Sequence, residues 1–455
     1  MLFYIITVIY GSISVYSYII SDSRIKYGNI PNYTRLESDE IIQNLNPTIL
    51  SNLEKIGIQS LNQLQYECIP KILDDYIKNV CILSQTGTGK TLSYLVPIVQ
   101  MILNSEEEST CVVIVPNSIL MYQVYDVLNN LTSGLNIKVK TVDDVEKGKV
   151  PNIVISSPLK LLNKFKTYSL NYNFDAFKTV KYLVLDEVDQ LFVHKQIIIE
   201  ILKRTKNRCK TILSSSTLPD YGTKSDSNTV SKLFKNCSYI KSQDLHKIPS
   251  KVSLEFINYK DEDDRGMLIL YRFNKVVEYL YSNNDRMIIY CNSSVNCEKL
   301  YNKLSNLGKN VHILNKNIDL MEQLLILTSL DKKMIILSTD HSSRGVDFKN
   351  IKTVIHYDFP TNVVNFIHRT GRVGRHGNEG NCLAFWSESD EFLKNHIENN
   401  LNSFVDCFII FFRLSKVFSR KRGLRKKFKK AQKLLEPTLS QEISSESQEY
   451  STESV

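Results

Sequence analysis

The segment Ser84–Thr91 (SQTGTGKT) places two glycines, a lysine and a threonine in the order that phosphate chemistry needs. It lies between apolar runs at Val80–Leu83 and Leu92–Leu103, which predict a strand and a helix. Gly87 and Gly89 permit tight turns, so that successive backbone N–H groups can face phosphate oxygens near the positive end of the helix. The segment predicts a nucleotide-binding loop; taken alone, a glycine-rich turn with an exposed lysine is the alternative.

The side chains at the end of this loop carry the expected chemistry. Lys90 can reach the β- and γ-phosphates of a nucleotide, and the hydroxyl of Thr91 can ligate Mg²⁺. The loop residues expected to contact the nucleotide are Ser84, Gln85, Thr86, Gly87, Thr88, Gly89, Lys90 and Thr91.

Acidic residues follow another apolar run, KYLVL, in the segment Asp186–Asp189 (DEVD). Carboxylates at the carboxyl end of a parallel strand lie beside a phosphate loop of the same sheet. Asp186 would hold Mg²⁺ through water, and Glu187 would orient and deprotonate the attacking water. For DEVD alone an acidic helix cap is the alternative, but the phosphate loop earlier in the chain favours the catalytic role.

Buried strands must position these loops, and the strand candidates are continuous apolar runs rather than alternating ones. Such runs are typical of a parallel sheet covered on both faces. The first series is Val80–Leu83, Cys111–Val115, Ile153–Ser156, Tyr182–Leu185 and Thr211–Ser214, with Val252–Ile257 after a polar stretch. The second series is Met287–Cys291, Val311–Leu314, Met334–Ser338, Thr353–Tyr357 and Cys382–Trp386, with helices such as Ser294–Leu307 between them.

Two serial blocks of this kind imply an α/β fold of two tandem, doubly wound parallel-sheet lobes that face each other across a cleft. The predicted organisation is a hydrophobic leader at 1–38, an ATP-binding lobe at 39–241, a linker at 242–249, a C-terminal lobe at 250–400, an apolar and basic extension at 401–435 and a polar tail at 436–455.

These residues resemble the DEAD-box RNA helicases, with Val188 where the family usually has alanine. The resemblance runs from about Asp39 to Trp386 and rests on several motifs in the family's order. It implies two RecA-like lobes, ATP and Mg²⁺ as cofactors, and RNA as the partner, with a protein cofactor as a further expectation. The implied activity is RNA-stimulated ATP hydrolysis coupled to local duplex unwinding or to remodelling of RNA–protein complexes.

The resemblance assigns further roles in the first lobe. Gln65 in LQYECIP looks like the glutamine that reads the adenine, although the family's Pro–Thr pair is absent before it. Ser215 and Thr217 look like the family's Ser-Ala-Thr motif. By this resemblance they would hydrogen-bond to Asp189 and couple hydrolysis to unwinding.

In the second half, Ser338–Phe348 (STDHSSRGVDF) and His368–Arg375 (HRTGRVGR) are close family matches. By the resemblance, Arg372 and Arg375 would act as arginine fingers on the γ-phosphate when the lobes close, and His368 would bridge to the first lobe. The nucleotide-binding residues of this half would be Gly345, Asp347 at the ribose, Arg372 and Arg375.

The family's RNA-groove motifs are present in altered form. The residues that would contact the RNA backbone, or position groups that do, are Pro116, Asn117, Gln123, Ser157, Pro158, Lys160, Thr339, Asp340 and Arg344. Ser118 stands where the family has arginine, Leu159 replaces a glycine, and Lys160 cannot form the bidentate fork of an arginine.

Three functions from different classes follow. The first is an ATP-dependent RNA helicase. The second is an ATP-gated RNA clamp with little unwinding, which the altered groove favours. The third is a non-catalytic scaffold, against which the intact Lys90, Glu187, Arg372 and Arg375 argue.

Charge and cysteine usage agree with a nucleic-acid partner. The 455-residue chain has a formal net charge of +9 and a pI near 8.8, which favours a polyanion. Its nine cysteines lack disulfide or zinc spacing and are interpreted as reduced core residues. Beyond the second lobe, an apolar run at Phe404–Phe412 precedes a basic run at Arg420–Lys433 that could anchor RNA.

The first residues of the chain predict where in the cell the protein is located. Met1–Ile20 is nearly uncharged and strongly apolar, and a polar segment with Arg24, Lys26 and Arg35 follows it. Together they resemble the two-part plastid leader of apicomplexan-type parasites, which predicts an apicoplast-like organelle and no stable membrane role after leader removal. A signal anchor is an alternative, and a misplaced start codon would instead leave the protein in the cytoplasm or nucleus.

Overall fold

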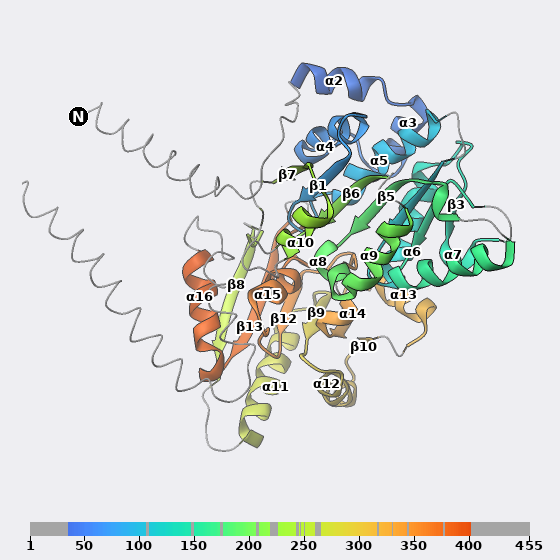
Figure 1. Cartoon of the computed structure of the whole chain (residues 1–455). Helices are drawn as coiled ribbons and strands as arrows, with labels where there is room; N and C mark the ends of the chain where they lie inside the picture. The colour runs from blue at the N-terminus through green and yellow to red at the C-terminus, as the bar shows by residue number, and fades with distance from the viewer. Residues whose placement is uncertain are drawn as a thin grey trace, which may run out of the picture.

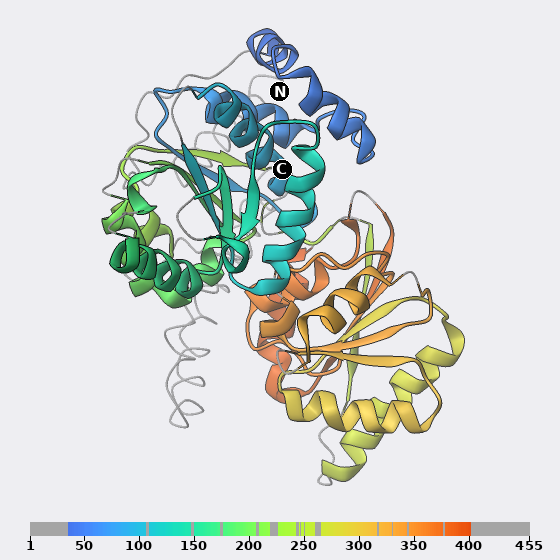
Figure 2. The same cartoon turned by 90° about the vertical axis from the view of Figure 1, so that its right-hand side faces the viewer.

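A computed structural model of the chain describes residues 35–401, apart from 106–108, 147–149, 173–175, 206–208, 219–225, 243–244, 246, 250, 260–264, 316–317, 330, 344 and 376–377. The described residues form two α/β lobes that pack against each other (Figure 1). Figure 2 shows the first lobe, in blue to green, above the second, in yellow to red.

The sheet of lobe one has seven parallel strands in the order β3-β4-β2-β5-β6-β1-β7. The five apolar runs of the first series all form strands, as predicted. Two short strands were not predicted, because one has only three residues and the other alternates with polar side chains. The strands are β1 (Asn79–Leu83), β2 (Thr110–Ile114), β3 (Val139–Thr141), β4 (Ile153–Ser156), β5 (Val180–Asp186), β6 (Lys210–Ser215) and β7 (Cys237–Lys241).

Helices cover both faces of this sheet, and asparagine side chains begin three of them. Asn46, Asn62 and Asn117 each accept a hydrogen bond from a backbone N–H of the following first turn. The helices are α2 (Arg35–Gln43), α3 (Pro47–Lys55), α4 (Gln63–Leu73), α5 (Lys90–Leu103), α6 (Ser118–Leu131), α7 (Pro158–Tyr172), α8 (Val188–Leu191), α9 (Lys195–Arg204) and α10 (Asp226–Leu233), with 3₁₀ turns at Val142–Asp144, Ala176–Lys178 and Phe192–His194.

Lobe two repeats the plan with six parallel strands in the order β10-β11-β9-β12-β13-β8. Its strands are β8 (Val252–Asn258), β9 (Met287–Tyr290), β10 (Val311–Leu314), β11 (Ile335–Ser338), β12 (Thr353–His356) and β13 (Gly380–Trp386). Its helices are α11 (Arg265–Ser282), α12 (Ser294–Asn306), α13 (Leu320–Thr328), α14 (Asp340–Ser343), α15 (Val363–Thr370) and α16 (Glu391–Leu401), with a 3₁₀ turn at Glu388–Asp390. The predicted fold class, two parallel-sheet α/β lobes, is confirmed.

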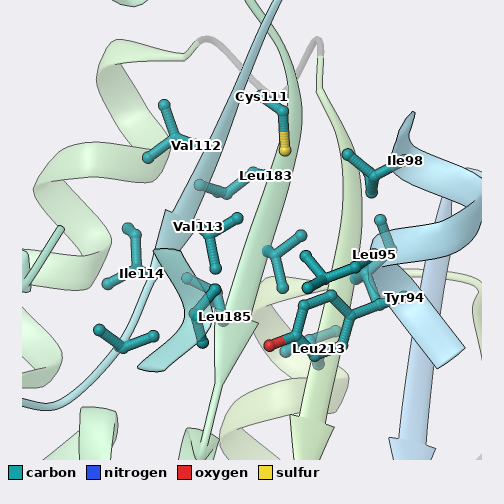
Figure 3. Packing of buried hydrophobic residues seen from close by; sticks show 14 of the residues in the cluster. Tyr94, Leu95, Ile98, Cys111, Val112, Val113, Ile114, Leu183, Leu185 and Leu213 are labelled. Atoms are coloured by element: carbon teal, nitrogen blue, oxygen red, sulfur yellow. The ribbon is translucent and has the colours of Figure 1, made fainter. Parts of the chain in front are cut away.

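Apolar side chains between helices and sheet form the core of each lobe. Figure 3 shows part of lobe one, where Tyr94 and Leu95 of α5 pack beside Leu183, Leu185 and Leu213 of the sheet. All eight cysteines within the described residues are buried and free, as expected of core thiols. Among the described residues, no helix is both long and apolar enough to span a membrane.

The lobes are joined between β7, which ends at Lys241, and β8, which begins at Val252. The linker predicted at 242–249 falls in this interval, and its bounds stay a prediction. The apolar leader at Met1–Ile20, the run Phe404–Phe412 and the basic run Arg420–Lys433 lie outside the described residues.

Candidate active site

The phosphate loop between β1 and α5 adopts the predicted turns. Gly87 and Gly89 have φ angles of 77° and 83°, in the left-handed region that side chains disfavour. Gly89 also approaches its surroundings closely, since a Cβ there would lie 2.7 Å from the Gln65 amide nitrogen. The helix α5 begins at Lys90, so its N-terminal end faces the loop.

Lys90 is buried within this loop. Its ammonium group donates to the carbonyl oxygens of Ser84 (2.8 Å) and Gln85 (2.7 Å) and to the hydroxyl of Ser216 (3.1 Å). Burial lowers the pKa of Lys90, and the negative charges of Glu187 and Asp186 act in the opposite direction. The loop therefore places the Lys90 side-chain nitrogen beside the acidic cluster, whose negative charge favours the protonated form.

Gln65, predicted to read the adenine, is tied to the phosphate loop. Its side chain closes a capping box with Asn62 at the start of α4, and its amide lies 3.4 Å from the Gly89 carbonyl oxygen. Asn62 also donates to the Thr88 carbonyl oxygen (2.9 Å). Asn62 supplies the helix cap at the position of the family's threonine, and the adenine-reading role of Gln65 stays a prediction.

The predicted catalytic acids stand at the end of β5 and are almost completely buried. Asp186 accepts a hydrogen bond from the Glu187 backbone N–H (3.0 Å) and another from the Tyr94 hydroxyl (2.9 Å). Glu187 has a positive φ of 54°, a strained conformation for a side chain of its size. Burial raises the pKa of both carboxyl groups, and for Glu187 the charge of Asp189 adds to the effect.

A polar bridge joins the two lobes next to these acids. Asp189 accepts from the hydroxyls of Ser215 (3.0 Å) and Thr217 (2.8 Å), as the family resemblance implied. His368 Nε2 lies 3.0 Å from the Thr217 hydroxyl and 3.2 Å from the Asp189 carboxylate. Ligand atoms of Glu187, Asp189 and His368 lie within 4.8 Å of one another, so lobe two touches the acidic cluster.

The loop before Arg375 also contacts the phosphate loop. The hydroxyl of Thr86 donates to the Gly371 carbonyl oxygen (3.0 Å). A Cβ at Gly87 would lie only 2.8 Å from Cγ of Arg375. Burial lowers the pKa of Arg375 to about 10, which leaves the guanidinium charged at neutral pH. We call this contact zone, Ser84–Thr91 and Asp186–Asp189 against His368–Arg375, the inter-lobe junction.

The two predicted arginine fingers differ in position. The Arg375 side chain reaches the phosphate loop and forms an ion pair with Asp347. Arg372 is buried and donates to the carbonyl oxygens of His368 and Val346 within its own lobe. Arg375 is therefore the arginine whose side chain packs on the phosphate loop, whereas Arg372 contacts backbone carbonyls of lobe two; the arginine-finger roles of both stay predictions.

Comparison with known families decides the affiliation. Residues 62–224 match the family described as DEAD/DEAH box helicase, and residues 271–377 match the family described as Helicase conserved C-terminal domain. Together the matches cover more than half of the chain and include both sides of the junction. This chain belongs to the DEAD-box helicases.

Curated relatives of this DEAD-box protein carry helicase names. It is 26% identical over 369 residues to ATP-dependent RNA helicase ROK1 of Meyerozyma guilliermondii. This match covers 76% of this chain and 65% of the relative. It is 26% identical over 367 residues to probable ATP-dependent RNA helicase ddx27 of Dictyostelium discoideum, covering 77% and 45%. The chain thus spans less than two thirds of the length of these two relatives. A third match, to probable ATP-dependent RNA helicase YfmL of Bacillus subtilis at 28% identity, covers 91% of that relative.

Solved structures share the fold of this DEAD-box protein. S. cerevisiae Dbp5 bound to RNA and ADP BeF3 has a TM-score of 0.67 at 21% identity, over 80% of this chain and 93% of the other. Mss116p bound to ssRNA and AMP-PNP has a TM-score of 0.67 at 22% identity, over 82% and 79%. At these identities the likeness establishes two RecA-like lobes.

Several residues predicted to contact RNA make hydrogen bonds within the DEAD-box protein itself. The Gln123 side chain donates to the Asp347 carbonyl oxygen and accepts from the Asp347 backbone N–H, both at 2.9 Å. These two bonds cross between lobes and place Gln123 at the lobe interface, and its predicted RNA contact stays a prediction. Asp347, predicted at the ribose, is paired with Gln123 and Arg375.

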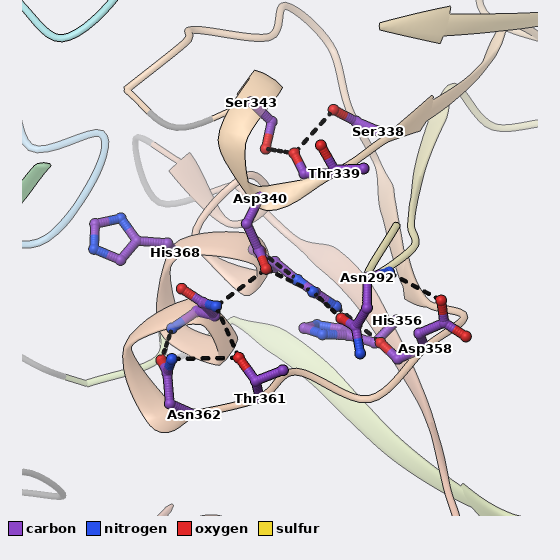
Figure 4. A network of polar contacts seen from close by, with 12 residues as sticks. Asn292, Ser338, Thr339, Asp340, Ser343, His356, Asp358, Thr361, Asn362 and His368 are labelled. Atoms are coloured by element: carbon purple, nitrogen blue, oxygen red, sulfur yellow. Dashed lines mark hydrogen bonds and ion pairs between the residues drawn. The ribbon is translucent and has the colours of Figure 1, made fainter. Parts of the chain in front are cut away.

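In lobe two, Asp340 and Asn292 belong to one polar network (Figure 4), which Arg369 joins by hydrogen bonds to both. Arg369 is 1% exposed and donates to Asp340, to Asn292 and to the Asp358 carbonyl oxygen. The Asp340 carboxylate therefore ties α14 to Arg369 of α15 while its side chain stays 21% exposed, and its role towards RNA stays a prediction. Thr339 lies 3.3 Å from the Ser342 hydroxyl at the start of the same turn.

The remaining predicted RNA contacts lie on lobe one. Asn117 caps α6 by accepting from the Leu120 backbone N–H (2.9 Å), directly after Pro116. Lys160 is exposed and pairs with Asp143 at 2.7 Å. Of two further predicted residues, Pro158 begins α7 and Ser157 directly precedes it. Arg344 lies outside the described residues.

Sequence reasoning missed two buried residues that the site uses. Tyr94 lies in an apolar helical run, which reads as core, although its spacing of three residues from Thr91 places both on one helix face. Arg369 lies between the predicted functional residues His368 and Arg372 in HRTGR. A charged residue within a largely apolar helical segment could have indicated its buried role.

Proposed function

We propose that this chain is an ATP-dependent RNA helicase, in which RNA binding stimulates ATP hydrolysis and hydrolysis drives local unwinding of RNA. The observation that supports it most is the inter-lobe junction. There, Lys90 and Glu187 of lobe one lie opposite His368 and Arg375 of lobe two, with direct contacts such as Thr86 to Gly371. A nucleotide held at this junction would contact both lobes, so neither lobe alone would hydrolyse ATP.

The donor set fits ATP with Mg²⁺. Thr91 offers a hydroxyl and Asp186 a buried carboxylate, the hard oxygen ligands that Mg²⁺ prefers alongside phosphate and water. Bound there, Mg²⁺ would neutralise charge on the β- and γ-phosphates. Lys90 would bind the phosphates and Glu187 would orient the attacking water. Arg375 would place a positive charge where negative charge develops, an effect worth on the order of 10³-fold or more.

Coupling to RNA would run through the bridge beside the acids. Asp189, Thr217 and His368 connect the catalytic strand of lobe one to the helix that carries Arg375's loop. RNA that lies across both lobes would favour their contact through its phosphates, which makes binding independent of sequence and sensitive to salt. Hydrolysis and phosphate release would then separate the lobes and release the strand.

The test is ATP hydrolysis by the full chain with and without RNA, beside a short-duplex unwinding assay. The proposal expects RNA to increase the hydrolysis rate and ATP to drive strand separation. RNA-stimulated hydrolysis without unwinding would instead identify an ATP-gated clamp. No hydrolysis under any RNA condition would overturn the enzymatic assignment and leave a scaffold.

We further propose that residues 1–38 direct the protein to a plastid-like organelle. The support is the order of an apolar run and a polar segment with basic residues. A fluorescent reporter joined after these residues is expected to reach the organelle. A reporter that stays in the cytoplasm or nucleus would reject this destination without affecting the enzymatic proposal.

A further inference from the structure

The Tyr94 side chain reaches from the core of lobe one into the active site. Its ring packs among apolar residues of α5 and the sheet, and the side chain is completely buried (Figure 3). Its hydroxyl donates a hydrogen bond of 2.9 Å to Oδ2 of Asp186. An otherwise hydrophobic position of α5 thus places one polar atom on a residue assigned to Mg²⁺.

The Asp186 carboxylate is held at both oxygens. The backbone N–H of Glu187 donates to Oδ1 at 3.0 Å, while Tyr94 donates to Oδ2. Two donors on opposite oxygens fix the rotation of the carboxylate about its side-chain bond. A buried carboxylate that lost one of them would carry an unsatisfied oxygen and could turn.

Tyr94 lies on the same helix face as the other proposed magnesium ligand, since Thr91 precedes it by three residues on α5. Burial, followed by the negative charge of Asp186, raises the pKa of Tyr94 well above its usual value, so the phenol stays protonated and acts as a donor.

We propose that Tyr94 is a positioning residue for Mg²⁺: its hydroxyl orients the Asp186 carboxylate before metal and nucleotide arrive. The inference rests on the proposed function, because it concerns the metal of that ATP site. Partners that orient metal ligands typically change metal affinity or activity by about 10–100-fold when they are removed. Tyr94 itself touches neither metal nor phosphate.

The test substitutes Tyr94→Phe in the full chain, which removes the hydroxyl and keeps the ring. Binding of a fluorescent ADP analogue is measured in a Mg²⁺ titration and again with the metal chelated. The variant is expected to need about 10-fold more Mg²⁺ for half-maximal metal-dependent binding, while metal-free binding stays unchanged. The matched control is Tyr182→Phe, which removes a hydroxyl from the other end of β5 and should leave both values unchanged.

Each result separates the two proposals. A wild-type chain that binds no nucleotide with or without Mg²⁺ would reject the proposed function itself. A wild-type chain with metal-dependent binding and a Tyr94→Phe variant with the same Mg²⁺ requirement would overturn the role of Tyr94 alone. Equal losses of metal-free and metal-dependent binding would also overturn it, since that pattern indicates a general defect in the nucleotide site.

Discussion

The inter-lobe junction and the predicted RNA face differ in the burial and hydrogen bonding of their side chains. At the junction, buried side chains from both lobes meet at hydrogen-bonding distance, as Thr217 does with His368 at 3.0 Å. On the RNA face of lobe one, Lys160 is exposed and pairs with Asp143, and Asn117 is engaged in capping a helix. The chain keeps most of the family's residues at the first region and alters several at the second, including Ser118, Leu159 and Lys160.

The difference follows from what each region must do. Stabilising the charge of a transferring phosphate requires groups placed to within a fraction of an ångström, because the gain depends on fixed geometry in a water-excluded site. Holding an RNA backbone uses several weak phosphate contacts that are spread out and screened by salt. Single losses are therefore tolerated on the RNA face and not at the junction.

The largest expected effect is at Arg375. Replacing it by alanine removes the charge that lobe two places on the phosphate loop, so the hydrolysis rate should fall by about 10³-fold or more. The rate is measured in single-turnover assays with saturating RNA, and nucleotide binding is followed separately. The matched control is Arg204→Ala, which removes a partly exposed arginine at the end of α9 that is paired with Glu200. Equal rates in both variants would show that the junction contact has no catalytic role.

A smaller effect is expected at the bridge. Thr217→Val keeps the shape of the side chain and removes the hydroxyl that joins Asp189 to His368. Loss of one buried hydrogen-bonding group costs about 1–3 kcal/mol, so unwinding should slow by about 10-fold or more. RNA-independent hydrolysis should change much less. Parallel losses in both activities would argue against a coupling role.

Glu187 offers a test of stability against pH. Burial raises its pKa, so the folded state holds the proton to higher pH than the unfolded state does. Its destabilising effect is absent below the unfolded pKa and grows as pH rises through the folded value. Glu187→Gln should therefore raise the melting temperature of the nucleotide-free protein by a few degrees at pH 8, and by less at pH 5. A larger gain at pH 5 would contradict this sign.

The smallest effect is expected on the RNA face. Lys160→Ala removes one exposed cation that is already paired with Asp143, so RNA affinity should fall by only about two- to three-fold. The slope of affinity against salt should drop by roughly one unit if Lys160 contacts a phosphate. A loss as large as that at Arg375 would remove the contrast between the two regions.

The sequence was sufficient where a motif is local. The loop around Lys90, the acids after β5 and the histidine–arginine segment of lobe two were all predicted, because each couples residue type to a strand or helix end. The two lobes followed from the continuous apolar runs. Short or partly polar strands such as β3 (Val139–Thr141) carry too little pattern and were missed.

What the sequence could not supply depends on distant contacts. Gln123 meets Asp347 across a separation of 224 residues, so no local pattern distinguishes this contact from an RNA contact. Arg372 and Arg375 look equivalent in HRTGRVGR, yet only one side chain reaches the phosphate loop. The sequence predicts Tyr94 as a core residue because its ring packs in the hydrophobic core, and only its hydroxyl belongs to the active site.

The most direct test of the junction is a double-mutant cycle between Lys90 and Arg375, measured as single-turnover ATP hydrolysis with saturating RNA. If both side chains act on the same nucleotide, the double alanine variant should be little slower than the slower single variant, because either loss already disables the site. Losses that multiply in the double variant would show that the two lobes act independently and would contradict a shared site.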